Sequence, residues 1–146
     1  MILVANKKIR AEYEIVKTFI AGMVLSGPEV KSLRLKNASL TGSFVKVIGG
    51  EVFLINAHIG PYSFADTTKY EPKQTRKLLL TKKEIAQLTG SLEKKNLTLV
   101  PLSIDAEGRR IKATIALARG LKKFEKREKI KQRDLERASA KESTSY

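Results

Sequence analysis

Basic side chains are the residues of this sequence whose type and spacing suggest a chemistry, and they are densest near its end. The stretch from Gly120 to Arg137, GLKKFEKREKIKQRDLER, has twelve charged residues among its eighteen. From Arg119 to Arg137, nine residues are basic and four are acidic. This excess favours binding to the phosphates of RNA. The alternative is a solvated helix or an appendage without a role, which is the usual explanation of a charge run.

The large apolar residues of the same stretch do not form a continuous helical face. Leu121, Phe124 and Leu135 fall near one another on a helical wheel, whereas Ile130 lies on the opposite side. Several like-charge pairs at i,i+4 spacing each destabilise a free helix by about 0.2–0.5 kcal/mol. Because bound phosphates would remove this repulsion, we expect the segment to be disordered when free and helical on binding. The broken apolar face disfavours a membrane-surface helix.

Residues for catalysis or metal binding are scarce. The chain has no cysteine and a single histidine, His58, so neither a thiolate site nor a histidine cluster can form. We interpret His58 as a structural residue near a turn. The carboxylates are scattered along the chain, and no motif for a nucleotide phosphate is present. The sequence therefore predicts no catalytic residue, no metal and no cofactor.

Length and charge are typical of one folded domain with a tail. The 146 residues are 42% hydrophobic, which is enough for a core, and the formal net charge of +14 favours a polyanionic partner. The opening MILVAN is too short for the apolar region of a signal peptide, and no apolar run approaches the roughly 20 residues of a membrane span. We expect a soluble, cytoplasmic protein with no membrane partner.

The first half of the chain contains patterns of strands, one helix and a hairpin. Residues 13–19 alternate as in a strand, and residues 21–25 form either a second strand or its continuation. Pro28 fits the first position of a short helix. Two alternating runs flank Gly49 and Gly50, a pair that supplies the positive φ angles of a tight turn. These patterns predict a hairpin at residues 43–56.

The second half contains patterns of a strand, a helix and a further hairpin. The strand ends near Leu80, and Thr81 with Glu84 fits a capping box at the start of a helix. Ile85, Leu88 and Leu92 then follow the spacing of one helical face. The runs LTLVPLSI and RIKATIALA, separated by DAEGR, predict the last hairpin.

These patterns predict a mainly β fold, in which an antiparallel, partly closed barrel carries two or three short helices. A two-layer α+β sheet is the alternative. We place the barrel domain at residues 1–118, the basic tail at 119–137 and a disordered terminus at 138–146.

Several stretches form an ordered set that is specific, although no single piece of it is. They are Asn6 with the basic residues after it, EY, AG and VL, GPEVKSLR, GEVFLINAHIGPY, TRKLLLTKKEIAQL, LTLVPLSI, IALARG and EKREKIKQRD. This set, over about residues 6 to 135, resembles the small protein B (SmpB) family, the tmRNA-binding proteins of bacteria.

The resemblance implies an oligonucleotide-binding-like barrel that acts as an adaptor in trans-translation, which is the rescue of stalled ribosomes. It implies a bacterial protein that binds the tRNA-like domain of tmRNA one to one, as a monomer. The tail is then expected to enter the empty mRNA channel of the ribosome, near the decoding site and the small-subunit rRNA, and to become helical there.

The resemblance also assigns residues to two surfaces. The expected tmRNA-binding residues are Asn6, Lys7, Lys8, Arg10, Tyr13, Lys31, Arg34, Arg76, Lys77 and Thr81. The expected ribosome-binding residues of the tail are Lys122, Lys123, Phe124, Lys126, Arg127, Lys129, Lys131 and Arg133. Tyr13 could equally fill the barrel, and Arg76 could reach the surface from a strand end. Ile20, Thr81 and Leu121 depart from the family pattern, which puts single contacts there in doubt.

Two other functions fit parts of the sequence. A general rRNA-binding or assembly protein needs only the same charge and a barrel, and selective binding to a tRNA-like fold would distinguish the two. An enzyme acting on RNA lacks a credible acid and base. We therefore expect a binding protein and not an enzyme.

Overall fold

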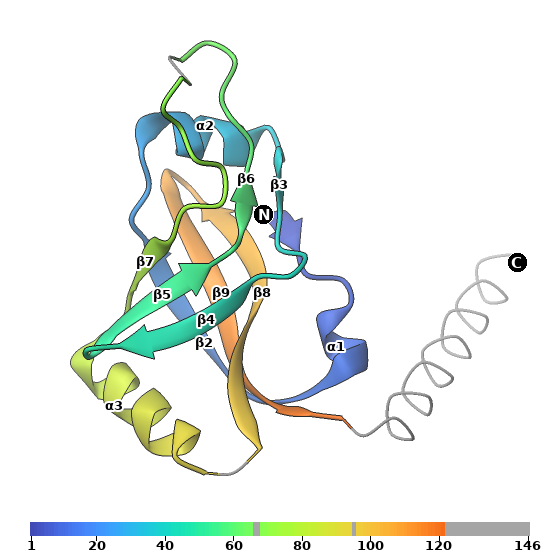
Figure 1. Cartoon of the computed structure of the whole chain (residues 1–146), viewed down its shortest axis with the longest axis vertical. Helices are drawn as coiled ribbons and strands as arrows, with labels where there is room; N and C mark the ends of the chain where they lie inside the picture. Colours follow the sequence, from blue (N-terminus) through green and yellow to red (C-terminus); the bar gives the residue numbers. More distant parts are fainter. Residues whose placement is uncertain (66–67, 95, 122–146) are drawn as a thin grey trace, which may run out of the picture.

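The strands and helices of the protein follow the chain as a mainly β domain (Figure 1). The computed structural model describes residues 1–65, 68–94 and 96–121. The strands are β1 (Ile2–Ala5), β2 (Tyr13–Met23), β3 (Ala38–Ser39), β4 (Phe44–Ile48), β5 (Glu51–Ile55), β6 (His58–Ile59), β7 (Arg76–Leu79), β8 (Leu97–Glu107) and β9 (Arg110–Gly120). The helices are α1 (Ile9–Glu12), α2 (Gly27–Arg34) and α3 (Lys82–Leu92).

Seven strands form one antiparallel sheet in the order β1-β8-β9-β2-β7-β5-β4, and β3 pairs separately with β6. The sheet curls so that β4 comes against β8 (Figure 1). Within the described ranges the two edge strands, β1 and β4, are not paired with each other. The prediction of a mainly β, antiparallel fold with few short helices is confirmed, but closure of a barrel is not.

The hairpin of β4 and β5 shows why local sequence determines this part of the fold. Gly49 and Gly50 have φ angles of 59° and 77°, in the left-handed region that glycine adopts without steric cost. The turn sets the register in which Val47 faces Val52. The predicted hairpin is confirmed.

Both longer helices begin at capping boxes. At α2 the Ser26 hydroxyl accepts the Glu29 backbone N–H, and the Glu29 carboxylate accepts the Ser26 N–H. Pro28 is the second residue of this helix rather than the first. At α3 the pair is Thr81 and Glu84, as the sequence predicts.

Strand β2 is continuous from Tyr13 to Met23, so the second of the two interpretations of residues 21–25 is correct. A bulge lies between Ile15 and Lys17, where the pairing with β9 shifts. Strand β1 and helix α1 were not predicted. β1 has only four residues and is paired with β8, about a hundred residues away in sequence.

Apolar side chains pack on both faces of the sheet. The main core lies inside the curl, where Leu54, Ile115 and the α3 residue Leu88 are fully buried. Ile85 and Leu92 pack partly against this core, which confirms the predicted apolar face of α3. A second, smaller cluster lies under α1 and consists of Ile9, Val100, Leu102, Ala116 and Ala118. Burial of Ile9 therefore fixes the short helix α1 to the sheet.

Strand β9 ends at Gly120, two residues beyond the boundary at 118 that the sequence suggests for the domain. Arg119 and Gly120 therefore belong to the sheet and not to the tail. The Leu121 backbone N–H donates to the Glu12 carbonyl at 3.0 Å, so the end of α1 holds the point where the chain leaves β9. The predicted tail and terminus, from residue 122 onward, lie outside the described residues.

Candidate nucleic-acid interface

Helix α2 presents two of the predicted contact residues on its exposed side. The Lys31 ammonium lies 5.4 Å from the centre of the Tyr62 ring, in a cation–π arrangement. The Arg34 guanidinium donates to the Gly108 carbonyl at 3.1 Å and thus connects α2 with the turn between β8 and β9. Lys31 and Arg34 are both exposed, as a surface for phosphates requires.

The turn between β8 and β9 adds cations that the sequence interpretation missed. Arg109 and Arg110 are exposed and line a hollow of about 500 Å³. Ile20 and Leu79, which are 62% and 52% exposed, also line it. The sequence did contain a signal for these exposed cations, because the two arginines directly follow the turn residue Gly108 and the tip of a hairpin lies at the surface.

Lys77 lies within β7, and Thr81 directly precedes α3. The Lys77 ammonium is 3.1 Å from a Glu51 carboxylate oxygen, and both side chains are about half exposed. Such a pair is weak in water, so a phosphate can replace Glu51 at little cost. The Thr81 hydroxyl accepts the Glu84 N–H at 3.2 Å and donates to its carboxylate at 3.0 Å. Thr81 therefore has a capping role in the free protein.

The N-terminal group of predicted contacts surrounds α1. Lys7, Lys8 and Arg10 are exposed. Asn6 is half-buried, and its side-chain amide donates to the Pro101 carbonyl at 3.1 Å, while its backbone N–H donates to Leu102. Asn6 thus positions the lysines that follow it.

Tyr13 has a packing role, but it does not fill the barrel, which was the alternative that the sequence left open. Its half-buried ring packs against the second apolar cluster, and in the sheet Tyr13 faces Gly120. An alanine-like Cβ at Gly120 would lie 4.0 Å from the ring, in ordinary contact. Tyr13 is consequently part of the support for the start of the tail.

These cations form two groups at opposite ends of β9. Arg34, Arg109 and Arg110 lie where the strand begins, and the α1 group lies where it ends. Eleven residues of strand separate the ends by roughly 33 Å. One extended or two separate stretches of RNA backbone can therefore contact the domain at the same time.

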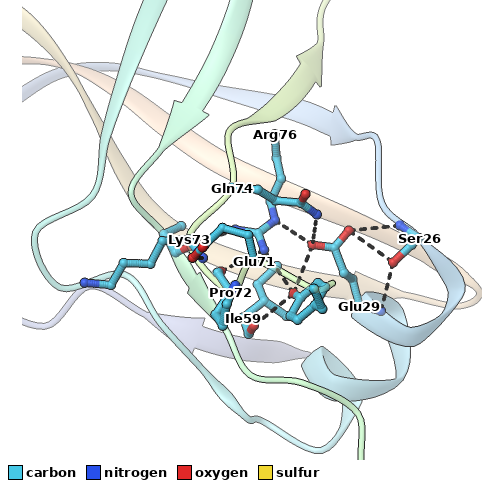
Figure 2. A network of polar contacts seen from close by, with 10 residues as sticks. Ser26, Glu29, Ile59, Glu71, Pro72, Lys73, Gln74 and Arg76 are labelled. Carbon is cyan, nitrogen blue, oxygen red and sulfur yellow. Dashed lines mark hydrogen bonds and ion pairs between the residues drawn. The ribbon is translucent and has the colours of Figure 1, made fainter. Parts of the chain in front are cut away.

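Arg76 contradicts the expectation of a surface cation, because it is only 2% exposed. Its guanidinium is enclosed by a network between β7, α2 and the segment before β7 (Figure 2). It donates to the Glu29 carboxylate at 2.7 Å, the Ala57 carbonyl at 2.6 Å, the Pro72 carbonyl at 2.9 Å and the Tyr70 hydroxyl at 3.1 Å. All of this donor capacity faces the interior, so Arg76 cannot hold a phosphate without unfolding its surroundings.

The network holds Glu29 in its charged form. Burial alone would raise the pKa of Glu29, but the hydrogen bond from the Ser26 backbone, those from Arg76 and Gln74, and the Arg76 charge together lower it. The pKa of Tyr70 is raised, chiefly by burial and then by the Glu29 charge, so its hydroxyl stays protonated. It donates to the Ile59 carbonyl at 2.9 Å. The network is thus a fixed support and not a site of proton transfer.

The remaining expectations concern the tail, metal sites and membrane spans. The eight predicted ribosome contacts of the tail lie at 122–133, beyond the last described residue. Among the residues that the structure describes, no three His, Asp or Glu side chains are grouped as a metal site. Over the same ranges, no helix has the length and apolar character to cross a membrane.

Comparisons with known proteins agree on one family. A family model described as SmpB protein matches residues 3–145. The SsrA-binding protein of Gloeobacter violaceus is 47% identical over 93% of this chain and 90% of its own length. The SsrA-binding protein of Chloroflexus aggregans is 48% identical over 93% of this chain and 87% of its own length. The SsrA-binding protein of Persephonella marina is 42% identical over 96% of this chain and 92% of its own length.

A solved structure gives the same result for the fold. A chain of the complex "tmRNA-SmpB: a journey to the center of the bacterial ribosome" superimposes with a TM-score of 0.68. It is 44% identical in sequence, and the match covers 82% of this chain and 84% of the solved one. The fold described above is therefore similar to that of a chain in this complex.

Proposed function

The chain belongs to the SmpB family, and we propose on this premise that it is an RNA-binding adaptor of trans-translation. It binds the tRNA-like domain of tmRNA and brings it to stalled ribosomes in the bacterial cytoplasm. The observation that carries this proposal is the family match over residues 3–145, together with relatives that are named for binding SsrA RNA. The protein acts by binding and has no reaction of its own.

The exposed cations support a division of labour within the chain. The folded domain recognises tmRNA with the exposed residues of the predicted set, while the tail from residue 122 contacts the ribosome in the empty mRNA channel and becomes helical there. Arg76 is removed from the recognition set because it is buried, and Arg109 and Arg110 join it because they are exposed beside Arg34.

Charge is suited to this task because each phosphate contact releases counterions. The domain needs cations at separated positions to follow a folded RNA, and the two groups at the ends of β9 provide them. Preference for a tRNA-like shape then comes from the spacing of the groups rather than from base sequence.

The test compares two proteins and two RNAs across a series of salt concentrations. The proteins are the full chain and a form truncated after Leu121, which retains every described element and the hydrogen bond to Glu12. The RNAs are the tRNA-like domain of tmRNA and a hairpin of equal length. We expect both proteins to prefer the tRNA-like domain at every salt concentration, and only the full chain to support tagging on stalled ribosomes.

Two outcomes would contradict the proposal. Equal affinity for both RNAs would indicate a general RNA-binding protein, because neutralised phosphates alone give the same slope of log K with log salt for either ligand. Loss of tmRNA binding on truncation would mean that the tail, and not the folded domain, carries the recognition.

A further inference from the structure

An aromatic cluster, formed by Tyr62 and Phe64, lies on the segment between β6 and β7, next to Lys31 of α2. Phe64 is 85% exposed, the largest exposed fraction among the large hydrophobic side chains of the described residues. Its ring meets that of Tyr62 edge to face, with centroids 5.4 Å apart. Tyr62 in turn carries the Lys31 ammonium at 5.4 Å from its ring centre. In Figure 1 this segment extends beyond α2, at the end of the molecule opposite α3.

Fixed contacts hold both ends of this segment. Gly60 donates its backbone N–H to the Asn37 carbonyl at 2.8 Å, and Ile59 donates to the Pro72 carbonyl at 3.0 Å. On the other side, the Tyr70 hydroxyl is part of the Glu29 and Arg76 network. The aromatic rings therefore project from a supported base, which lowers the entropy that a ligand must remove on binding.

A hollow of about 410 Å³ opens beside the Tyr62 ring. Its lining includes Ser26, Pro28, Tyr62, Lys69 and Tyr70. Lys69 is exposed, as is Lys31 on the neighbouring helix. The Glu29 carboxylate of the neighbouring network is buried and paired with Arg76 at 2.7 Å. The lining of the hollow thus combines the Tyr62 and Tyr70 rings with the Lys69 ammonium group, which gives the hollow a positive rim.

We propose that this aromatic cluster binds an unpaired nucleotide of RNA, and the proposal rests on the proposed function of the chain. The base stacks on the Phe64 ring, and its phosphates lie near Lys31 and Lys69. Every base has a π face, so this contact requires an unpaired nucleotide but not a particular sequence. The positive rim and the net charge of +14 favour RNA over a hydrophobic protein surface.

The contact adjoins the cation group at the start of β9, because Lys31 and Arg34 both lie on α2. It adds a preference that the cation groups cannot supply, because phosphate contacts do not distinguish paired from unpaired RNA. A tRNA-like fold exposes unpaired bases in its loops, so the aromatic cluster would contribute to recognition of loops rather than stems.

The test uses the full chain and a fluorescent single-stranded RNA of twelve nucleotides containing 2-aminopurine, with a duplex of the same length as the second ligand. Phe64→Leu keeps an apolar side chain but removes the ring, and Phe44→Leu is the matched control on β4, where Phe44 is 45% exposed. We expect Phe64→Leu to weaken single-stranded binding about tenfold and to abolish quenching of the 2-aminopurine. Single-stranded binding by Phe44→Leu and duplex binding by Phe64→Leu should both equal those of the parent.

Three results would overturn the inference: single-stranded binding by Phe64→Leu equal to that of the parent, an equal loss for the duplex, or an equal loss in Phe44→Leu. Loss through misfolding is recognised by thermal unfolding of each variant, and Lys31→Met then gives a second variant in a folded background. Preference for the tRNA-like domain over a hairpin is measured in the same parent protein. Failure of that preference would refute the proposed function, whatever Phe64→Leu does.

Discussion

Replacing Arg76 by methionine should destabilise the protein strongly while leaving its electrostatic attraction to RNA unchanged. The substitution removes four hydrogen bonds and leaves the Glu29 carboxylate buried without its partner. Breaking a buried pair by removing one member costs about 3–5 kcal/mol, since the remaining charge stays desolvated. With a urea dependence of about 2 kcal/mol per molar, the midpoint of unfolding should fall by about 2 M.

Lys77 is the matched control, because it is the next residue of β7 and points to solvent. Lys77→Met removes the same charge but should change the free energy of unfolding by no more than about 0.5 kcal/mol. It should also reduce the slope of log K against log salt by about 1, if Lys77 contacts a phosphate. Arg76→Met should leave that slope as it is in the parent.

Urea unfolding followed by circular dichroism measures the first effect, and RNA titrations in native buffer measure the second. Arg76→Lys keeps the charge but not the planar donors, so its midpoint should lie between those of the parent and Arg76→Met. The reasoning is refuted if Arg76→Met unfolds within about 1 kcal/mol of the parent, or if it lowers the salt slope as Lys77→Met does.

Three further predictions concern the elements around this network. The folded-state pKa of Glu29 lies below its ordinary value of 4.5, so the contribution of its charge to stability is complete above pH 4.5 and is lost as the pH falls through the folded-state pKa. In Glu29→Gln the free energy of unfolding should therefore fall less steeply with acid than in the parent. An unchanged acid profile would contradict this. Thr81→Ala should cost about 1 kcal/mol in urea unfolding through loss of the cap, with Thr81→Ser near the parent; equal losses would exclude capping as the cause. Gly50→Val should cost about 1–2 kcal/mol at its positive φ, and Gly50→Asn less, as thermal unfolding would measure; a neutral valine would mean that the turn rearranges.

Local chemistry made much of the fold predictable. The Gly49 and Gly50 turn and the Thr81 cap depend on residues within four positions of one another, so the sequence contains their whole cause. β1 lacked such a signal, since four residues become a strand only by pairing with β8. The curl of the sheet is likewise a property of distant pairings, and for that reason closure could not be decided from the strand pattern.

The candidate site was predictable where exposure follows from chain position. Lys31, Arg34 and the lysines around α1 are exposed as expected. The prediction that Arg76 contacts RNA at the surface was wrong, because its partner Glu29 is 47 residues away in sequence. In the structure Arg76 shares a face of β7 with Leu78, which is 2% exposed. The sequence did not indicate this face, because Leu78, Leu79 and Leu80 follow one another without alternation, and the preference of arginine for surfaces then decided the prediction.

The pairing of β2 with β9 has a consequence for how the protein is made. Tyr13 faces Gly120 in the sheet, so the 106 residues between the two partners must be synthesised before they can pair. At a synthesis rate of about 5–20 residues per second, β2 waits roughly 5–20 s before its neighbour exists. During that time its apolar side, with Phe19 and Ala21, has no complete core to enter. Glu14 and Lys17 interrupt the apolar run of this strand, and their charges oppose aggregation of the nascent chain until β9 arrives.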